Sequence, residues 1–334
     1  MLGIKLGLMQ VNIVFFQKMS SIKIKKSYFY SKFPAKNHFN SMIFKYQTWK
    51  KYFGMLYLFE AKTDFTECMK MIDFTSVGYK ITDAHIHPAL LVEGSDFTQF
   101  NFTTPPEQFV ATLKRAGISQ AAGSVIRRFA ETPSWGDIHK LNLAALEMQK
   151  MFPDFYIPGI HIHPAHPAES LDELEKMHRD HGVRLIGELV AYMMGYSEYA
   201  QAALDDIWKF ADETGMAVSL HISTLEDAAT LLKKFPTLKV IIAHPTASPA
   251  EFTARMELVS RYTNTALDIS GSGPNTYNML RHAINIAGKE KVIFGTDFPL
   301  RNPGMYVAGV LFEELSEAEY TAIFHDNFHR LLGC

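Results

Sequence analysis

The stretch KITDAHIHPAL (Lys80–Leu90) opens the region that decides the fold, and it places His85 and His87 at the end of a short apolar run with one residue between them. In a β-strand, residues i and i+2 point to the same face, so the two imidazoles would project together. Paired imidazoles suit a divalent metal. A strand end can also expose two histidines to water without any function, so this stretch alone leaves both interpretations open.

The chain after this stretch repeats one pattern, in which short apolar runs alternate with amphipathic segments. The amphipathic segments predict helices, and several of them end in Gly, as helix C-termini often do. The apolar runs predict strands at residues 80–87, 118–126, 155–163, 183–190, 216–222, 239–245, 265–270 and 291–299.

Strands that alternate with helices indicate right-handed βαβ units and a parallel sheet. The region from Ile81 onward has the length of a (β/α)8 (TIM) barrel, which is typically about 250 residues. We therefore predict the α/β class and one barrel domain over residues 76–334. A doubly wound open sheet is the competing architecture, but we find no Gly-rich dinucleotide turn in the sequence.

Residues 1–75 differ from the rest, because they mix Lys, Phe, Tyr, Ser and Asn without a sustained helical or strand period. We interpret them as an unstructured basic extension, upstream of an alternative start at Met69 or Met71. A basic arm that binds a membrane or nucleic acid, or a weak signal peptide, is the functional alternative.

The small net charge of −2 hides an asymmetry between the two parts of the chain. Residues 1–51 contain ten lysines and no acidic residue, so the remaining 283 residues carry 23 basic and 35 acidic side chains. An acidic body is a poor candidate for binding nucleic acid, because that affinity depends on basic residues that meet phosphates. We expect a small-molecule substrate and no nucleic-acid or membrane partner, with a homo-oligomer left open.

The two cysteines, Cys68 and Cys334, form neither a disulfide framework nor a CxxC motif, so a metal site would be built from His, Asp and Glu. A reducing cytoplasm is the expected location. The sequence shows no uninterrupted apolar run of about 18 residues, which a membrane-spanning helix would need.

Ligand-type residues recur at the predicted strand ends. In a barrel the carboxyl ends of the strands form the active-site face. Random placement would not repeatedly put such residues at the same end of different strands, so the opening pair now indicates a metal site. The six residues are His85, His87, Glu188, His221, His244 and Asp297.

The region from Ile81 to Gly333 resembles the amidohydrolase superfamily, in particular its amidohydrolase-related branch. The resemblance is carried by DAHIHP, LHIS, IAHP, FGTDFP and the closing IFHDNFHRLLG. It implies that His85, His87, His221 and Asp297 are metal ligands and that His244 is a catalytic or second-metal residue. IGELV resembles the version in which a strand-four glutamate, here Glu188, bridges two metals, and the number of metals stays open.

These residues predict a divalent metal, with zinc preferred and manganese as a substitute, in one or two copies. Zinc lowers the pKa of a bound water toward about 7, Asp297 could take the proton of that water, and His244 could polarise a carbonyl or donate to the leaving group. Arg127, Arg301 and Tyr192 are candidate substrate-binding residues, because an arginine can pair with a substrate carboxylate.

The leading prediction is a metal-dependent hydrolase that cleaves an amide, ester or lactone in a small, carboxylated molecule. A decarboxylase or hydratase on the same scaffold is the first rival, because fold and ligands do not fix the reaction. A catalytically silent barrel that only binds a ligand is the second rival, and the complete ligand set argues against it.

Overall fold

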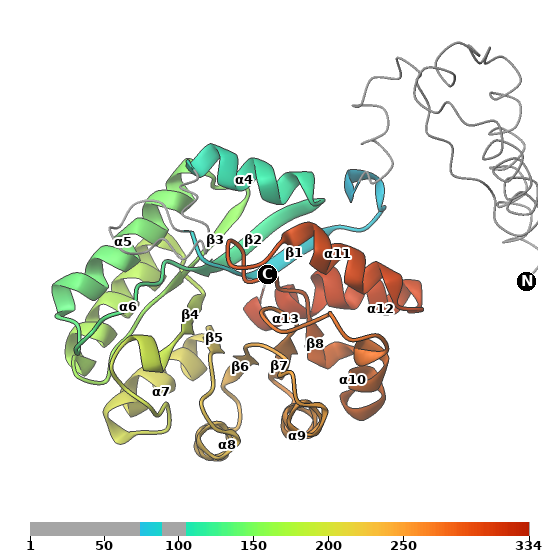
Figure 1. Cartoon of the computed structure of the whole chain (residues 1–334). Helices are drawn as coiled ribbons and strands as arrows, with labels where there is room; N and C mark the ends of the chain where they lie inside the picture. The colour runs from blue at the N-terminus through green and yellow to red at the C-terminus, as the bar shows by residue number, and fades with distance from the viewer. Residues whose placement is uncertain (1–73, 89–104, 334) are drawn as a thin grey trace, which may run out of the picture. The chain divides into compact units, whose positions relative to one another are not determined.

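A computed structural model describes residues 74–88 and 105–333, so the predicted extension lies almost wholly outside the described residues. Eight parallel strands form one sheet in sequence order (Figure 1). The strands are β1 (Ile81–Ile86), β2 (Ile118–Ser124), β3 (Tyr156–Ile160), β4 (Leu185–Leu189), β5 (Ala217–Leu220), β6 (Lys239–Ile242), β7 (Thr265–Asp268) and β8 (Val292–Ile293).

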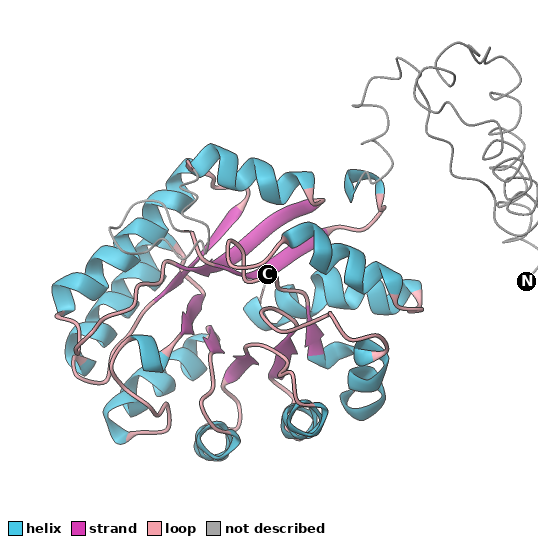
Figure 2. Ribbon diagram, in the orientation of Figure 1, coloured by secondary structure: helices cyan, strands magenta, loops and turns pink. Residues whose placement is uncertain are grey.

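Helices follow the strands and lie outside them, as the cyan ribbons around the magenta arrows show (Figure 2). The main helices are α4 (Pro106–Arg115), α5 (Trp135–Met151), α6 (Pro167–His181), α7 (Asp205–Thr214), α8 (Leu225–Lys234), α9 (Pro249–Ser260), α10 (Met279–Ala287), α11 (Pro303–Phe312), α12 (Glu317–Thr321) and α13 (Asn327–Leu332). Short 3-10 helices are η2 (Phe74–Ser76), η3 (Ala191–Met193), η4 (Ala202–Leu204) and η5 (Lys289–Lys291). A π-helix, η6 (Ala322–Asp326), joins α12 to α13.

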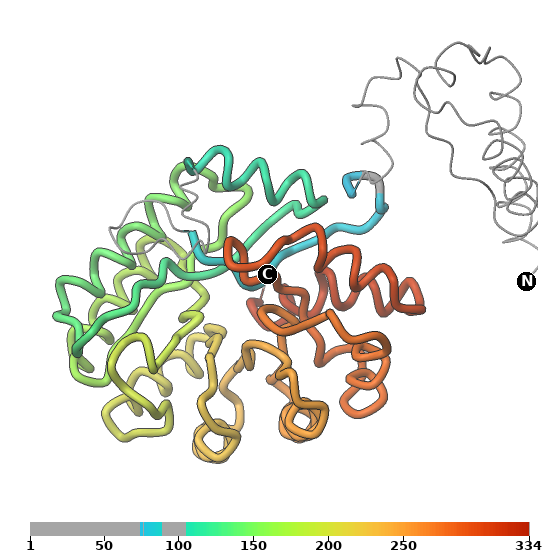
Figure 3. The backbone as a smooth tube through the Cα atoms, viewed as in Figure 1, coloured from blue at the N-terminus to red at the C-terminus, as the bar shows by residue number. Residues whose placement is uncertain are grey.

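The first and last strands approach each other, so the sheet nearly closes into a barrel. The N–H of Ala84 donates to the carbonyl of Phe294 at 3.0 Å, and the N–H of Asp297 donates to the carbonyl of His85 at 2.8 Å. Figure 3 shows the same meeting, with the blue start of the described chain beside its red end. The predicted (β/α)8 barrel is therefore confirmed.

Local sequence signals begin several of the helices. The hydroxyls of Ser134, Thr224 and Ser248 accept hydrogen bonds from backbone N–H groups in the first turns of α5, α8 and α9. Such caps satisfy donors that have no partner inside the helix. At the other end, Gly182 and Gly215 adopt the left-handed conformation after α6 and α7, where a residue with a Cβ would be strained.

A buried apolar cluster joins the strands to the last helix. Phe328, Leu331 and Leu332 of α13 pack with residues from the strands. Thr82, near the start of β1, contacts Nε2 of His329 through its hydroxyl at 2.9 Å. Helix α13 thus lies at the end of the barrel where β1 begins, opposite the predicted ligands. None of the helices in the described ranges is both long and apolar enough to cross a membrane.

Candidate metal centre

The predicted ligands lie at the carboxyl ends of their strands. They cluster because parallel strands in a barrel end at one face. All except His221 and His244 are buried, and those two are partly exposed. His85 and Glu188 lie within strands, whereas His87, His221, His244 and Asp297 lie just beyond them.

His85 and His87 point their Nε2 atoms at each other across 3.1 Å. Nδ1 of His85 lies 3.0 Å from a carboxylate oxygen of Asp268, and Nδ1 of His87 lies 3.0 Å from the carbonyl oxygen of Ser124. Both partners accept hydrogen bonds, so each Nδ1 carries a proton, and in the neutral imidazole each Nε2 presents a lone pair. Two converging lone pairs repel unless a cation or a proton lies between them, so this arrangement suits two metal ligands.

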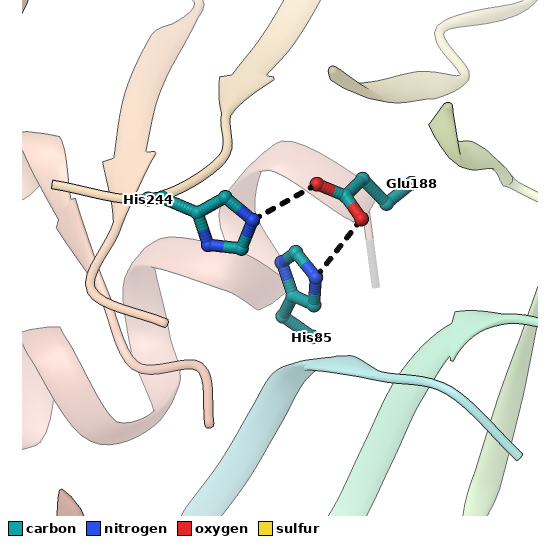
Figure 4. A group of neighbouring side chains, drawn as sticks. All are labelled: His85, Glu188 and His244. Carbon is teal, nitrogen blue, oxygen red and sulfur yellow. Dashed lines mark ion pairs between the residues drawn. The ribbon is translucent and has the colours of Figure 1, made fainter. Parts of the chain in front are cut away.

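Glu188 divides the cluster into two sets. One carboxylate oxygen, Oε2, lies 3.2 Å from Nε2 of both His85 and His87. The other, Oε1, lies 3.2 Å from Nδ1 of His221 and 3.3 Å from Nε2 of His244. Figure 4 shows this carboxylate between the His85 and His244 rings, with one oxygen directed at each. A carboxylate placed in this way can bridge two cations.

Asp297 completes the set around His87. Its Oδ1 lies 3.5 Å from Nε2 of His87 and 3.9 Å from Nε2 of His85. The backbone at Asp297 has a φ of 67°, and His244 has a φ of 66°. This left-handed region is unfavourable for residues with a Cβ, and such strain concentrates at functional sites. The fold therefore holds two of the six residues in a backbone conformation that is unfavourable for any residue with a Cβ.

His244 keeps its position partly because Gly271 leaves it room. A Cβ at Gly271 would lie 2.4 Å from Nδ1 of His244, which is too close. Nδ1 of His244 instead lies 2.9 Å from the hydroxyl of Ser270. The same hydroxyl lies 3.0 Å from Nδ1 of His85, so one serine contacts histidines from both sets.

The electrostatics of the cluster favour a cation. Burial by itself would raise the pKa of Glu188, but His85, His221 and His244 hold that pKa well below its usual value. Burial would lower the pKa of His85, whereas Glu188 and Asp268 raise it well above its usual value. The buried carboxylate is thus ionised and the cluster retains a proton at His85, which a metal ion would displace on binding.

The donor atoms fit a divalent metal. Two groups have ligand atoms that all lie within 4.8 Å of one another: His85 with Glu188 and His244, and His85 with His87 and Asp297. Nitrogen and carboxylate donors are the ligands that zinc takes in proteins, and manganese accepts the same types. Hydrogen bonds from the far ring nitrogens to Asp268 and Ser124 fix the tautomers, as is usual for metal-bound histidines.

Asp268 and Ser270 belong to the site, although the sequence analysis did not select them. Asp268 is the last residue of β7 and is fully buried. The available signal was its place at a strand end in TALDIS, the same place that singled out Glu188 in β4. A further buried carboxylate, Asp83, accepts hydrogen bonds from the backbone N–H groups of His85 and Thr296 and so joins the chain after β8 to β1.

The candidate substrate residues are placed differently from one another. The Tyr192 ring is half exposed and lies 5.2 Å from the His221 ring. The guanidinium of Arg128, rather than that of Arg127, lies over Tyr192 at 5.2 Å. Arg127 lies over Phe129 at 5.0 Å and also lines an outer hollow formed mainly by α5.

Arg301 is exposed, and its backbone N–H donates to the carbonyl of Asp297 at 3.2 Å. The structure thus places the Tyr192 ring beside the predicted ligand His221 and joins the backbone of Arg301 to that of Asp297. The guanidinium of Arg127 instead contacts Phe129, which is not part of the cluster. Any contact of these three side chains with substrate stays a prediction.

The comparisons with known proteins identify the family of this chain. A family model described as amidohydrolase matches residues 82–334. The chain belongs to this amidohydrolase family. The match covers every residue of the cluster and confirms the family that the sequence motifs indicated. No curated protein matches this amidohydrolase chain.

Solved structures similar to this amidohydrolase include a dihydroxybenzoic acid decarboxylase from Polaromonas with bound manganese (15% identity, 76% of this chain, 97% of that chain, TM-score 0.57). A 5-carboxyvanillate decarboxylase from Sphingomonas paucimobilis is similar over 76% of this chain and 99% of that chain (13% identity, TM-score 0.57). A 4-oxalomesaconate hydratase from Rhodopseudomonas palustris is similar over 76% of this chain and 95% of that chain (15% identity, TM-score 0.55). At these identities the likeness shows the fold alone.

Proposed function

We propose that this amidohydrolase is a metal-dependent hydrolase of an amide, ester or lactone bond in a small, carboxylated molecule. The single observation that carries the proposal is the position of Glu188, whose two oxygens face two separate sets of nitrogen ligands. A pair of cations bridged in this way is a common arrangement for activating water and clamping a reacting group.

The residues divide into two metal positions in this proposal. His85, His87 and Asp297 would hold one ion together with Oε2 of Glu188. His221 and His244 would hold the second with Oε1. Zinc is the metal that we propose, and manganese would substitute. When bound, such an ion lowers the pKa of water toward about 7 and polarises a carbonyl.

Asp297 is the group that we assign to proton transfer. Its carboxylate belongs to the first set of ligands, and its backbone is fixed by the hydrogen bond to His85. It can accept a proton from the nucleophile and pass it to the leaving group, as a general base that later acts as an acid. His244 lies on the opposite side of Glu188, where its imidazole can orient or polarise the carbonyl of the substrate.

Recognition of the substrate is assigned to the rim formed by Tyr192 and Arg128. Tyr192 contacts the His221 ring, and the Arg128 guanidinium stacks on Tyr192. A guanidinium pairs well with a carboxylate through two parallel hydrogen bonds. We therefore propose a carboxylated substrate, bound with its charge at this rim and its reacting bond at Glu188. The acidic body of the chain further favours a small molecule over a polyanion.

A lyase is the second candidate. Structures of similar fold are named as decarboxylases and as a hydratase. A carboxylate held by Arg128 near His221 could be a group that leaves rather than a handle for binding. Since the same scaffold supports several reactions, only turnover separates the two candidates.

The deciding experiment combines metal analysis with a substrate panel. The full-length protein is loaded with zinc or manganese and assayed with lactones, N-acyl amino acids and hydroxylated aromatic acids, with carbon dioxide and new carboxyl groups measured separately. The proposal is supported if the protein hydrolyses a member of the panel and if Arg128→Gln raises the KM for that compound more than it lowers kcat. Carbon dioxide release without hydrolysis makes the lyase the function. Protein that binds no divalent metal contradicts both.

A further inference from the structure

His161 is a buried histidine whose Nδ1 lacks a partner. It follows β3 directly, and its side chain is only 2% exposed. Its Nε2 lies 2.9 Å from the carbonyl oxygen of Val125. Its Nδ1 makes no hydrogen bond to any residue that the structure describes. Buried polar atoms are nearly always paired in folded proteins, so this one calls for an explanation.

The His161 ring lies at the same end of the barrel as the candidate metal ligands. The carbonyls of Ser124 and Val125 are consecutive at the end of β2, and they hold the imidazoles of His87 and His161 respectively. Successive carbonyls of an extended strand point to opposite neighbours, which are here β1 and β3. Burial has the largest effect on the pKa of His161, and the carboxylate of Glu188 raises that pKa slightly against it. His161 and His87 are therefore held on the two sides of the end of β2.

The tautomer of His161 follows from its one hydrogen bond. A carbonyl oxygen only accepts, so Nε2 carries the proton and Nδ1 presents a lone pair. Burial lowers the pKa of His161 to about 4, so the ring stays neutral at pH 7. In this state Nδ1 is an acceptor and cannot donate.

The backbone at His161 is held in place by a buried side chain of α5. Asn142 accepts from the His161 N–H at 2.7 Å and donates to the His161 carbonyl at 3.0 Å. The same Asn142 amide donates to a carboxylate oxygen of Glu173 at 2.8 Å. Two hydrogen bonds to one residue's backbone fix where its ring begins, so the unpaired Nδ1 has a defined position.

His163 shows that pairing is available at this strand end. It lies two residues further on and is equally buried. Its Nε2 lies 2.8 Å from the carbonyl of Met194, and its Nδ1 accepts from the N–H of Ala165 at 3.1 Å. Both ring nitrogens of His163 are thus used within the protein, whereas the buried Nδ1 of His161 has no partner among the described residues.

We propose that Nδ1 of His161 accepts a hydrogen bond from an O–H or N–H group of the substrate, next to the bond that reacts. This assignment rests on the proposed function, because it places the substrate at the metal centre. It adds a selection rule, since compounds that carry a donor beside the reacting group bind and compounds in which that donor is methylated do not. His161 is then a substrate-binding residue that is not a metal ligand.

Two isosteric variants separate the two ring nitrogens. The amide of Asn lies near the place of Nδ1, so His161→Asn keeps an acceptor there and loses the bond to Val125. The amide of Gln lies near the place of Nε2, so His161→Gln keeps that bond and loses the acceptor. His163→Gln serves as a control for the loss of a neighbouring buried imidazole.

The probes are two matched pairs: N-acetylglycine with N-acetylsarcosine, and 2-hydroxybenzoate with 2-methoxybenzoate. Each is titrated into zinc-loaded, full-length protein, and nitrogen NMR of labelled histidine reports Nδ1 of His161, assigned by its absence in His161→Gln. We expect at least one donor-bearing probe to shift this resonance while its methylated partner does not. We expect His161→Gln to weaken that probe by about 5- to 10-fold and His161→Asn to weaken it much less.

The proposal is overturned if no probe moves the Nδ1 resonance. It is also overturned if both members of each pair move the resonance equally, which is the result expected if a bound water, rather than the probe, donates to Nδ1. It is also overturned if His161→Gln and His163→Gln weaken the donor-bearing probe to the same extent. Because NMR needs no turnover, these results stand apart from the assay of the proposed function. If the wild type turns over a substrate and His161→Gln binds the donor-bearing probe with unchanged affinity, only the role of His161 is refuted. If a donor-bearing probe shifts the Nδ1 resonance but no substrate is turned over, only the hydrolase is refuted.

Discussion

A carboxylate oxygen of Asp268 lies 3.0 Å from Nδ1 of His85, which joins the end of β7 to the end of β1 behind the metal centre. Both side chains are buried. The carboxylate fixes the tautomer that turns Nε2 of His85 toward Glu188, and it raises the basicity of that nitrogen. Asp268 would therefore act on a bound metal through His85.

We predict that Asp268→Asn lowers metal affinity by about 10- to 100-fold, because the amide carries no charge to polarise His85. The measurement is competition with a chromogenic chelator. Asp227→Asn is the matched control, since Asp227 is also a buried aspartate but accepts from the N–H groups of Tyr199 and Ala200. The control should lower the free energy of unfolding without changing metal affinity. Equal affinity in Asp268→Asn and wild type would contradict the role of Asp268.

Glu188→Gln tests the bridge between the two ligand sets. The neutral amide offers one oxygen, so it can serve one set but not both. We expect elemental analysis of purified protein to show about two metal ions per chain in wild type and about one in the variant. A wild-type content of one ion that does not change in Glu188→Gln would show that Glu188 does not bridge.

Asp297→Asn should separate the chemical step from metal binding. The amide oxygen can still face His87, but it cannot accept a proton from the nucleophile. We expect kcat to fall by about 10²- to 10⁴-fold on an identified substrate while much of the metal is retained. His85→Ala should instead lose metal and activity together, because it removes a ligand. Near-normal kcat in Asp297→Asn would eliminate the proton-transfer role and favour a lyase mechanism centred on His244.

The periodicity of the sequence was enough to predict the barrel and the order of its eight strands. Several predicted strands run past the observed ends, most of all residues 291–299, of which only Val292–Ile293 forms β8. The clustering of His85, His87, Glu188 and Asp297 followed from the same reasoning, because parallel strands end at one face. These features are local, or they follow from topology alone.

The residues that support the ligands could not be read in the same way. Asp268 and Ser270 both contact His85, but they lie 183 and 185 positions away from it in the sequence. The strand-end position of Asp268 indicates that its side chain faces the site, but nothing near it in the chain indicates that its partner is His85. Arg127 and Arg128 are neighbours in the sequence, yet the guanidinium of Arg127 lies over Phe129 and that of Arg128 lies over Tyr192.

The pH dependence of stability should carry a signature of His329 at the opposite end of the barrel. Burial, His325 and Lys80 lower the pKa of His329 to about 4. In the unfolded chain His329 therefore binds a proton as the pH falls below about 6.5. In the folded chain it binds that proton only near pH 4. Stability from this group is complete above about pH 6.5 and is lost as the pH falls toward 4.

We expect His329→Gln to flatten this decline. Urea unfolding of chelator-treated wild type and variant, compared at several pH values between 7 and 4.5, measures the difference without a contribution from metal loss. The variant should lose less unfolding free energy than wild type over that range. Parallel pH profiles for the two proteins would show that His329 does not titrate differently in the folded and unfolded states.

The first part of the chain should be dispensable for the barrel. Every proposed ligand lies beyond residue 80, and the chain divides into two units between Met69 and Lys70. We predict that removal of residues 1–68 leaves cooperative unfolding, metal content and turnover unchanged. Activity assays and urea unfolding of the truncated protein check this.

Removal of residues 1–80 is the contrasting truncation, because it also deletes side chains that pack on the barrel. The Tyr79 hydroxyl donates to Glu317 at 2.7 Å, and the Tyr79 ring lies 5.2 Å from that of Tyr320. Phe74 packs against the core as well. We expect this longer deletion to lower the free energy of unfolding, since it exposes apolar surface that the folded barrel buries. A loss of stability or activity already in the shorter deletion would show that residues 1–68 contribute to the fold, and the interpretation of this segment as an extension would be wrong.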